Sequence, residues 1–250
     1  MALPVPTQAS SEVLSKAIRD ATNTKSTYKF LYFPLNGRGE TIRNLLAYGN
    51  VDYEDVIADW PAMKKDTRFG CVPVLFETTA SGTVLEFSES QAIERYLARK
   101  FGLLGSNEWE EHLVNEYVNS VDTTAGNALT KILFAPVETR NKSAEEFYKS
   151  QLAPWIQIHE GHLKANGGNG HYVGDKFSWA DIKLSTAINV LLTMVPKGLE
   201  KEIEALINPE ATPNIWKVRE AALAHPSLGE WLKSDKLVQY SVANKGFFKF

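Results

Sequence analysis

The chain has 250 residues, of which 44% are hydrophobic and 11% aromatic, and 27 basic side chains stand against 30 acidic ones. This balance is typical of folded globular proteins and argues against the disordered, fibrous and membrane-embedded classes. The formal charge of −3 argues against a nucleic-acid partner, which favours a basic face. The single cysteine, Cys71, excludes an internal disulfide framework and suits a reducing compartment.

Residues 1–27 are predicted to be an N-terminal extension. Apolar residues recur in it at helical spacing and predict a short amphipathic helix: Val13, Leu14, Ala17, Ile18 and Ala21. The segment lacks the basic and apolar regions of a secretory signal, and Glu12 and Asp20 do not suit an acid-poor transit peptide. We therefore expect an appended tail or docking helix and a cytoplasmic protein.

Residues 28–104 are predicted to form a small α/β domain. Strands are expected over Tyr28–Phe33, Asp52–Ile57, Val72–Phe76 and Thr83–Phe87, the last two joined as a hairpin. One helix follows Gly37-Arg38-Gly39, and a capping box of Ser88 and Gln91 is expected to open another. The order β-α-β-α-β-β-α predicts a mixed sheet with at least one parallel crossover.

Residues 105–250 read as an all-helical domain, which makes the predicted fold class α+β. Capping boxes are expected at Ser143 with Glu146 and at Ser178 with Asp181. Two further helices are predicted near Ile215–Ala224 and Leu228–Leu232. His159 and His162 are three residues apart beside a glycine, whereas the zinc-binding helix motif needs its histidines four apart, so we interpret them as a surface pair and expect no metal site.

Pro73 stands inside an otherwise apolar predicted strand, where it removes a main-chain donor. Such prolines belong on an edge strand or at a bulge. An edge at Val72 would offer main-chain groups with which an extended peptide could pair. The alternative interpretation of Pro73 is a plain bend in the strand.

Glu89 and Ser90 stand at the start of the next predicted helix. Unpaired N–H groups and the positive end of the helix dipole favour a carboxylate there, the Ser hydroxyl adds a donor, and Glu89 could accept from an ammonium group. The alternative is simple capping of the helix by Ser88. By themselves, Tyr32 reads as a core residue and Arg38 as part of a turn.

Five motifs occur in one order over about 200 residues: YKFLYFPLNGRGE at Tyr28–Glu40, DWPAMK at Asp59–Lys64, FGCVPVL at Phe69–Leu75, ESQAIERYLA at Glu89–Ala98 and YVGDKFSWAD at Tyr172–Asp181. In sequence and spacing they resemble the cytosolic glutathione transferases of the sigma class. This resemblance implies a thioredoxin-like domain followed by a helical domain, with glutathione as co-substrate and no metal.

The resemblance also implies a role for each matching residue. Tyr32 would be the catalytic hydroxyl and Arg38 would support it. The residues implied to contact glutathione are Trp60 and Lys64 at its glycine end, Gly70, Cys71, Val72 and Pro73 along its cysteinyl unit, and Glu89 and Ser90 at its γ-glutamyl end. Asp122 would reach the site of a neighbouring subunit in a homodimer.

The implied reaction is conjugation of the glutathione thiolate to small hydrophobic electrophiles, a detoxification activity. A thiol with a pKa of about 8.5 is only a few per cent ionised at pH 7, so a hydrogen bond from Tyr32 to the sulfur would favour the charged form and lower that pKa. Two departures bear on binding, since Glu89 stands where the family often has Gln, and Cys71 where a polar residue is common. The alternatives are a glutathione-dependent isomerase of the prostaglandin-synthase type and a non-enzymatic, ligand-binding or crystallin-like member.

Overall fold

A computed structural model of the chain describes residues 3–21, 25–126, 130, 132, 134–193, 195 and 198–248. The chain divides into two compact units, Met1–Phe101 and Gly102–Phe250. In the described part of the chain, no helix has the length and apolar character needed to cross a membrane.

The first unit is built around a four-stranded mixed sheet with the strand order β2-β1-β3-β4. Its strands are β1 (Thr27–Tyr32), β2 (Tyr53–Ile57), β3 (Val74–Thr78) and β4 (Val84–Ser88). β1 pairs parallel with β2 and antiparallel with β3, and β4 pairs antiparallel with β3. The parallel pair needs a crossover, which contains helix α2 (Glu40–Tyr48), so the predicted β-α-β order is confirmed.

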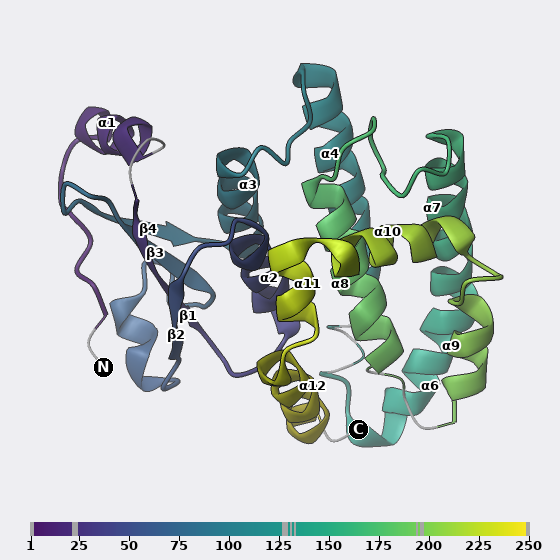
Figure 1. Cartoon of the computed structure of the whole chain (residues 1–250). Helices are drawn as coiled ribbons and strands as arrows, with labels where there is room; N and C mark the ends of the chain where they lie inside the picture. The colour runs from purple at the N-terminus through teal and green to yellow at the C-terminus, as the bar shows by residue number, and fades with distance from the viewer. Residues whose placement is uncertain are drawn as a thin grey trace. The chain divides into compact units, whose positions relative to one another are not determined.

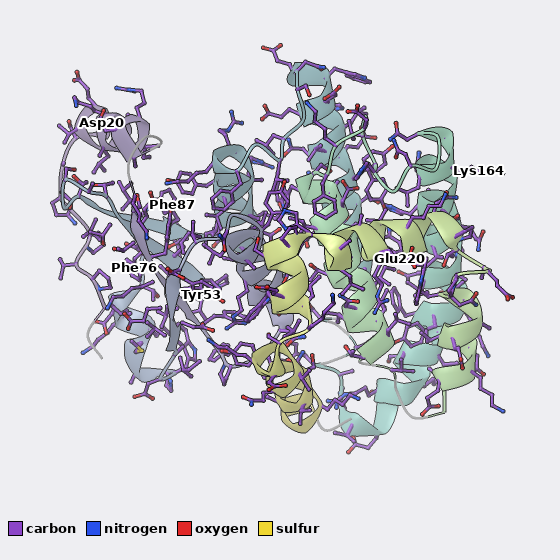
Figure 2. The ribbon with its side chains drawn as sticks, in the orientation of Figure 1. Asp20, Tyr53, Phe76, Phe87, Lys164 and Glu220 are labelled. Carbon is purple, nitrogen blue, oxygen red and sulfur yellow. The ribbon has the colours of Figure 1, made fainter. Side chains whose placement is uncertain are left out.

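Side chains along each strand alternate between the two faces of the sheet, and other elements of the first unit cover each face. Helices α2 and α3 (Ser90–Lys100) lie on one side of the sheet, and the N-terminal segment and the 3-10 turn η2 (Ala62–Asp66) lie on the other (Figure 1). Phe30 on the first face packs under Arg43 of α2. On the second face, Leu31, Val74 and Phe76 form a buried cluster with Ala58. Figure 2 shows the side chains along the sheet, with Tyr53, Phe76 and Phe87 on three of its strands.

Two local predictions for this sheet are wrong. β3 lies between β1 and β4 and begins at Val74, so Pro73 comes just ahead of an interior strand rather than inside an edge strand. Ser88 is the last residue of β4, and α3 begins at Ser90 with Glu89 as its N-cap. The capping-box pattern therefore placed the helix start one residue early, because the strand extends through Ser88.

The predicted N-terminal helix is confirmed as α1 (Ser11–Ala21), which buries Ala17 and Ala21. The segment before it is held to the sheet by hydrogen bonds between Thr7 and Val84. Figure 1 shows this segment running beside the sheet before it reaches α1.

The second unit is helical throughout its described elements, and α8 packs against α4 and α10. Its elements are α4 (Glu108–Val121), the π-helical turn η3 (Asp122–Gly126), α6 (Val137–Phe147), the π-helical turn η4 (Tyr148–Leu152), α7 (Ala153–Ala165), α8 (Trp179–Thr193), α9 (Glu200–Leu206), α10 (Pro213–Ala224), α11 (Pro226–Leu232) and α12 (Asp235–Phe248).

Of the two capping boxes predicted in this unit, one is confirmed and one is wrong. Ser178 precedes α8, and the Asp181 carboxylate accepts hydrogen bonds from the Ser178 main-chain N–H at 2.8 Å and from its hydroxyl at 2.9 Å. Ser143, in contrast, lies inside α6, which starts at Val137 after Pro136. The α+β class, with a thioredoxin-like sheet unit followed by an all-helical unit, is confirmed.

His159 of α7 is buried, which overturns the prediction of a surface pair with His162. Its ring nitrogens are hydrogen-bonded to the Ser120 hydroxyl at 3.0 Å and to the Tyr172 hydroxyl. Burial, and then the nearby His162, lowers the pKa of His159 to about 4. The imidazole is therefore neutral at pH 7 and serves as a buried hydrogen-bonding group.

We expect the helical unit to lose stability as the pH falls from 6.5 towards 4. The unfolded state binds the His159 proton at a pH where the folded state does not, so up to about 3 kcal/mol is lost over this interval. Replacement His159→Gln should flatten that part of the stability profile, measured by urea unfolding followed by circular dichroism. His112→Gln is the matched control, because the His112 side chain on α4 is exposed, and an equal flattening in both variants would contradict the assignment.

Candidate active site

Tyr32 is the last residue of β1, and the turn that follows forms a cradle around its ring. Its hydroxyl oxygen accepts a hydrogen bond from the Arg38 main-chain N–H at 3.0 Å. A Cβ at Gly37 would lie 2.6 Å from that oxygen, and one at Gly39 would overlap the ring. Gly37 also has φ +45°, which L side chains rarely adopt. The Gly-Arg-Gly sequence therefore permits the close approach of its main chain to the phenol.

The Tyr32 phenol is protonated at neutral pH. Its burial raises the pKa, while the hydrogen bond from the Arg38 main chain and the charges of Arg43 and Arg38 act in the opposite direction. The oxygen already accepts a main-chain hydrogen bond, and no acceptor for its own proton is found among the described residues. The phenol can therefore donate a hydrogen bond to a ligand atom at this end of β1.

Arg43, on the buried face of α2, holds the chain that leaves β1. It donates hydrogen bonds to the main-chain oxygens of Leu35 at 2.6 Å and Phe33 at 3.0 Å. It also pairs with the buried carboxylate of Asp55 on β2, with Nε and Oδ2 3.3 Å apart. Its guanidinium lies 5.6 Å from the centre of the Tyr32 ring. A fully buried cation thus ties together α2, β2 and the residues that directly follow Tyr32.

Glu40 adds a second buried carboxyl group near this cation. Burial raises its pKa to about 7, with the Arg43 charge lowering it and Asp55 raising it. Sequence reasoning missed Glu40, Arg43 and Asp55. The available signal for two of them was that Glu40 and Arg43 carry opposite charges three residues apart on a helix that also buries Ile42, Leu45 and Leu46.

The segment that leads into β3 supplies main-chain groups. The Val72–Pro73 peptide bond is cis. Within the described part of the chain, the main chain of Val72 makes no hydrogen bond, since pairing in β3 starts at Val74. The main chain here can therefore pair with an extended ligand, as the sequence suggested, although the reason is a break before an interior strand rather than a sheet edge.

The start of α3 faces this segment, because β3 begins where β4 ends and Val74 pairs with Ser88. Ser90 is the first residue of α3 and is largely buried. Glu89 has φ +68°, and its carboxylate accepts from the Cys71 thiol across 3.8 Å. Burial, and then the Glu89 charge, raises the pKa of Cys71, so this thiol is a poor nucleophile at neutral pH.

Trp60 and Lys64 come from the connection between β2 and β3. The Trp60 ring packs edge-on against Phe33 with centroids 6.2 Å apart, and Phe33 in turn contacts Tyr32 at 5.5 Å. Lys64 lies beside Gly70, where a Cβ would be 3.3 Å from the lysine Cε. Both residues therefore join the end of the sheet at which β1 and β2 finish.

The structure brings ten of the eleven predicted residues to one end of the sheet in the first unit: Tyr32, Arg38, Trp60, Lys64, Gly70, Cys71, Val72, Pro73, Glu89 and Ser90. Asp122 belongs to the second unit, where its carboxylate pairs with Lys183 of the same chain at 2.8 Å. No group of three or more metal-binding side chains is present among the described residues. The site thus offers a protonated phenol, unpaired main chain, a helix start and a cation.

This combination defines a thioredoxin-like unit that presents unpaired main chain beside a phenol donor, followed in sequence by a helical unit. The family described as glutathione S-transferase, C-terminal domain, matches residues 127–235. A class-mu 28 kDa glutathione S-transferase isozyme of Schistosoma japonicum is 31% identical over 82% of this chain and 96% of its own. Human hematopoietic prostaglandin D synthase is 29% identical over 82% of this chain and 95% of its own.

Among solved structures, a sigma class glutathione S-transferase of Fasciola hepatica superposes with a TM-score of 0.71 at 26% identity, covering 83% of this chain and 96% of that one. The chain belongs to the glutathione S-transferase family. The similarity to sigma-class relatives confirms the resemblance found in the sequence motifs.

Proposed function

We propose that the protein is a glutathione transferase that joins the thiolate of glutathione to small hydrophobic electrophiles, with Tyr32 as the catalytic residue. The observation that carries this proposal is the Tyr32 phenol, which is buried, protonated, and held at its oxygen by the Arg38 main chain. Such a group stabilises an anion next to it by donating its proton in a hydrogen bond. A hydrogen bond from this phenol would favour the thiolate form of a bound glutathione.

Glutathione is a short peptide with charged groups at both ends, and the site offers a partner for each part. The γ-glutamyl carboxylate would accept hydrogen bonds at Ser90 and the start of α3, and the ammonium group would pair with Glu89. The main chain of Val72, flanked by Gly70, Cys71 and Pro73, would pair with the cysteinyl unit. Trp60 and Lys64 would hold the glycine carboxylate.

The hydrogen bond from Tyr32 acts on the ionisation of the thiol. A thiol with a pKa near 8.5 is about 3% ionised at pH 7, and a fall of two pKa units, worth about 2.7 kcal/mol, raises this to about three quarters. Attack of the sulfur on the electrophile then needs no proton transfer to Tyr32. The thiol proton leaves to solvent, and the phenol stays protonated as a donor throughout.

The same site also favours a second candidate function, a glutathione-dependent isomerase. Two of the similar proteins are named hematopoietic prostaglandin D synthase, from human and chicken, each 29% identical over 95% of its length. An isomerase would turn over a prostaglandin endoperoxide with catalytic glutathione and show weak conjugation. A ligand-binding or crystallin-like member would bind glutathione weakly and show neither activity.

The proposal includes a homodimer in the cytoplasm, with a role in detoxification. In it, Asp122 would reach the glutathione site of the partner. Asp122 is already paired with Lys183 of its own chain, so its carboxylate would have to bind Lys183 and the partner's glutathione at the same time.

The test is an ultraviolet titration of the thiolate in the complex of the wild-type protein with glutathione. We expect the thiol pKa to fall by about two units from 8.5, which a hydrogen bond to a charged acceptor can supply. Binding without a pKa shift would contradict the role of Tyr32. No binding at millimolar glutathione would contradict the transferase proposal and favour the non-enzymatic one.

A further inference from the structure

The N-terminal segment packs on the same face of the sheet as part of the candidate site. Leu3 contacts the buried cluster of Leu31, Ala58, Val74 and Phe76. Trp60, Met63 and Val72 pack on the same cluster and are only partly buried. Leu3 therefore shares its packing surface with two residues proposed to contact glutathione, Trp60 and Val72.

Thr7 fastens this segment to the sheet. Its main-chain N–H donates to the Val84 oxygen at 2.9 Å, and its hydroxyl accepts from the Val84 N–H at 2.9 Å. β4 is the edge strand on this side, so Val84 has main-chain groups that no further strand satisfies. The contact gives the segment a defined register on the sheet.

The side chains of the segment differ in exposure. Leu3 is partly buried, whereas Val5 is 81% exposed. The two apolar residues form a matched pair, because Leu3 packs on the cluster and Val5 lies in solvent.

We propose that the N-terminal segment is a positioning element of the glutathione site, in which Leu3 sets the affinity for glutathione without touching it. Side chains that pack on a shared cluster move when a neighbour in it is truncated, since a partly exposed cluster collapses into the gap. Trp60, Met63 and Val72 are among the partly buried side chains packed on this cluster. This inference rests on the proposed function, because it assigns these residues to glutathione.

The experiment compares Leu3→Ala and Val5→Ala in the full chain. For Leu3→Ala we expect the Kd and KM for glutathione to rise about 3- to 10-fold, with kcat at saturating glutathione within about twofold of wild type, because the binding residues are displaced while the phenol is not. Hydrogen exchange in residues 58–66 should be faster without glutathione. Val5→Ala should match the wild type in every measurement.

The possible outcomes separate this inference from the proposed function. If the wild type binds glutathione and Leu3→Ala lowers the melting temperature without changing the glutathione Kd, the segment is structural only and the inference is wrong. If the wild type does not bind glutathione, the proposed function fails and the inference fails with it. Thr7→Val, which removes only the hydroxyl acceptor for Val84, should shift the Kd in the same direction and replaces Leu3→Ala should that variant not fold.

Discussion

Replacing Tyr32 by Phe is expected to return the pKa of bound glutathione to about 8.5 and to lower kcat/KM at pH 6.5 about 10- to 100-fold, the value of one lost hydrogen bond to a charged group. The phenol is the one group at the end of β1 whose oxygen is held by main chain while its proton has no acceptor among the described residues. The glutathione Kd measured at low pH, where the thiol is neutral, should change little. Ultraviolet titration gives the thiol pKa, and steady-state kinetics give kcat/KM.

Tyr28→Phe is the matched control, since Tyr28 is buried at the opposite end of the same strand. It removes the same hydroxyl group from β1 and should leave the thiolate pKa at its wild-type value. Should Tyr32→Phe retain a depressed thiolate pKa, another group ionises the thiol. The helix start at Ser90 would then be the next candidate.

Replacing Arg43 by Met is expected to lower the free energy of unfolding by about 3–5 kcal/mol, because it leaves a buried carboxylate without its cation. Asp55 would lose its ion pair with Arg43, and the main-chain oxygens of Phe33 and Leu35 would lose the hydrogen bonds that Arg43 donates. The turn that cradles Tyr32 would lose its anchor as well, so kcat/KM should fall. Urea unfolding and steady-state kinetics measure the two effects.

The double variant Arg43→Met with Asp55→Asn separates the charge from the packing. Removal of both charges should recover part of the lost stability, since the penalty of an unpaired buried carboxylate disappears. The value of kcat/KM should recover less than the stability, because the main-chain oxygens of Phe33 and Leu35 still lack the hydrogen bonds from Arg43. A loss below about 1 kcal/mol in Arg43→Met would be typical of a surface ion pair and would contradict this role.

The sequence by itself determined the elements that depend on local patterns. Short apolar and aromatic runs with turn residues between them give the four strands, helical spacing gives α1 and the later helices, and the Ser178–Asp181 capping box lies at the start of α8. These signals are readable because each arises from residues a few positions apart. The ordered motifs also led to the family and to ten residues that share one end of the sheet.

Only the tertiary structure decided how residues from distant elements are paired and buried. Whether β3 is an edge or an interior strand depends on β4 lying beside it, and whether Leu3 packs on the cluster of Leu31, Ala58, Val74 and Phe76 depends on where the N-terminal segment crosses the sheet. Arg43 and His159 look like ordinary polar helix residues, and their burial becomes visible only with Asp55, Ser120 and Tyr172 in place. The physical reason is that burial and charge pairing are properties of neighbours in space, which local periodicity does not encode.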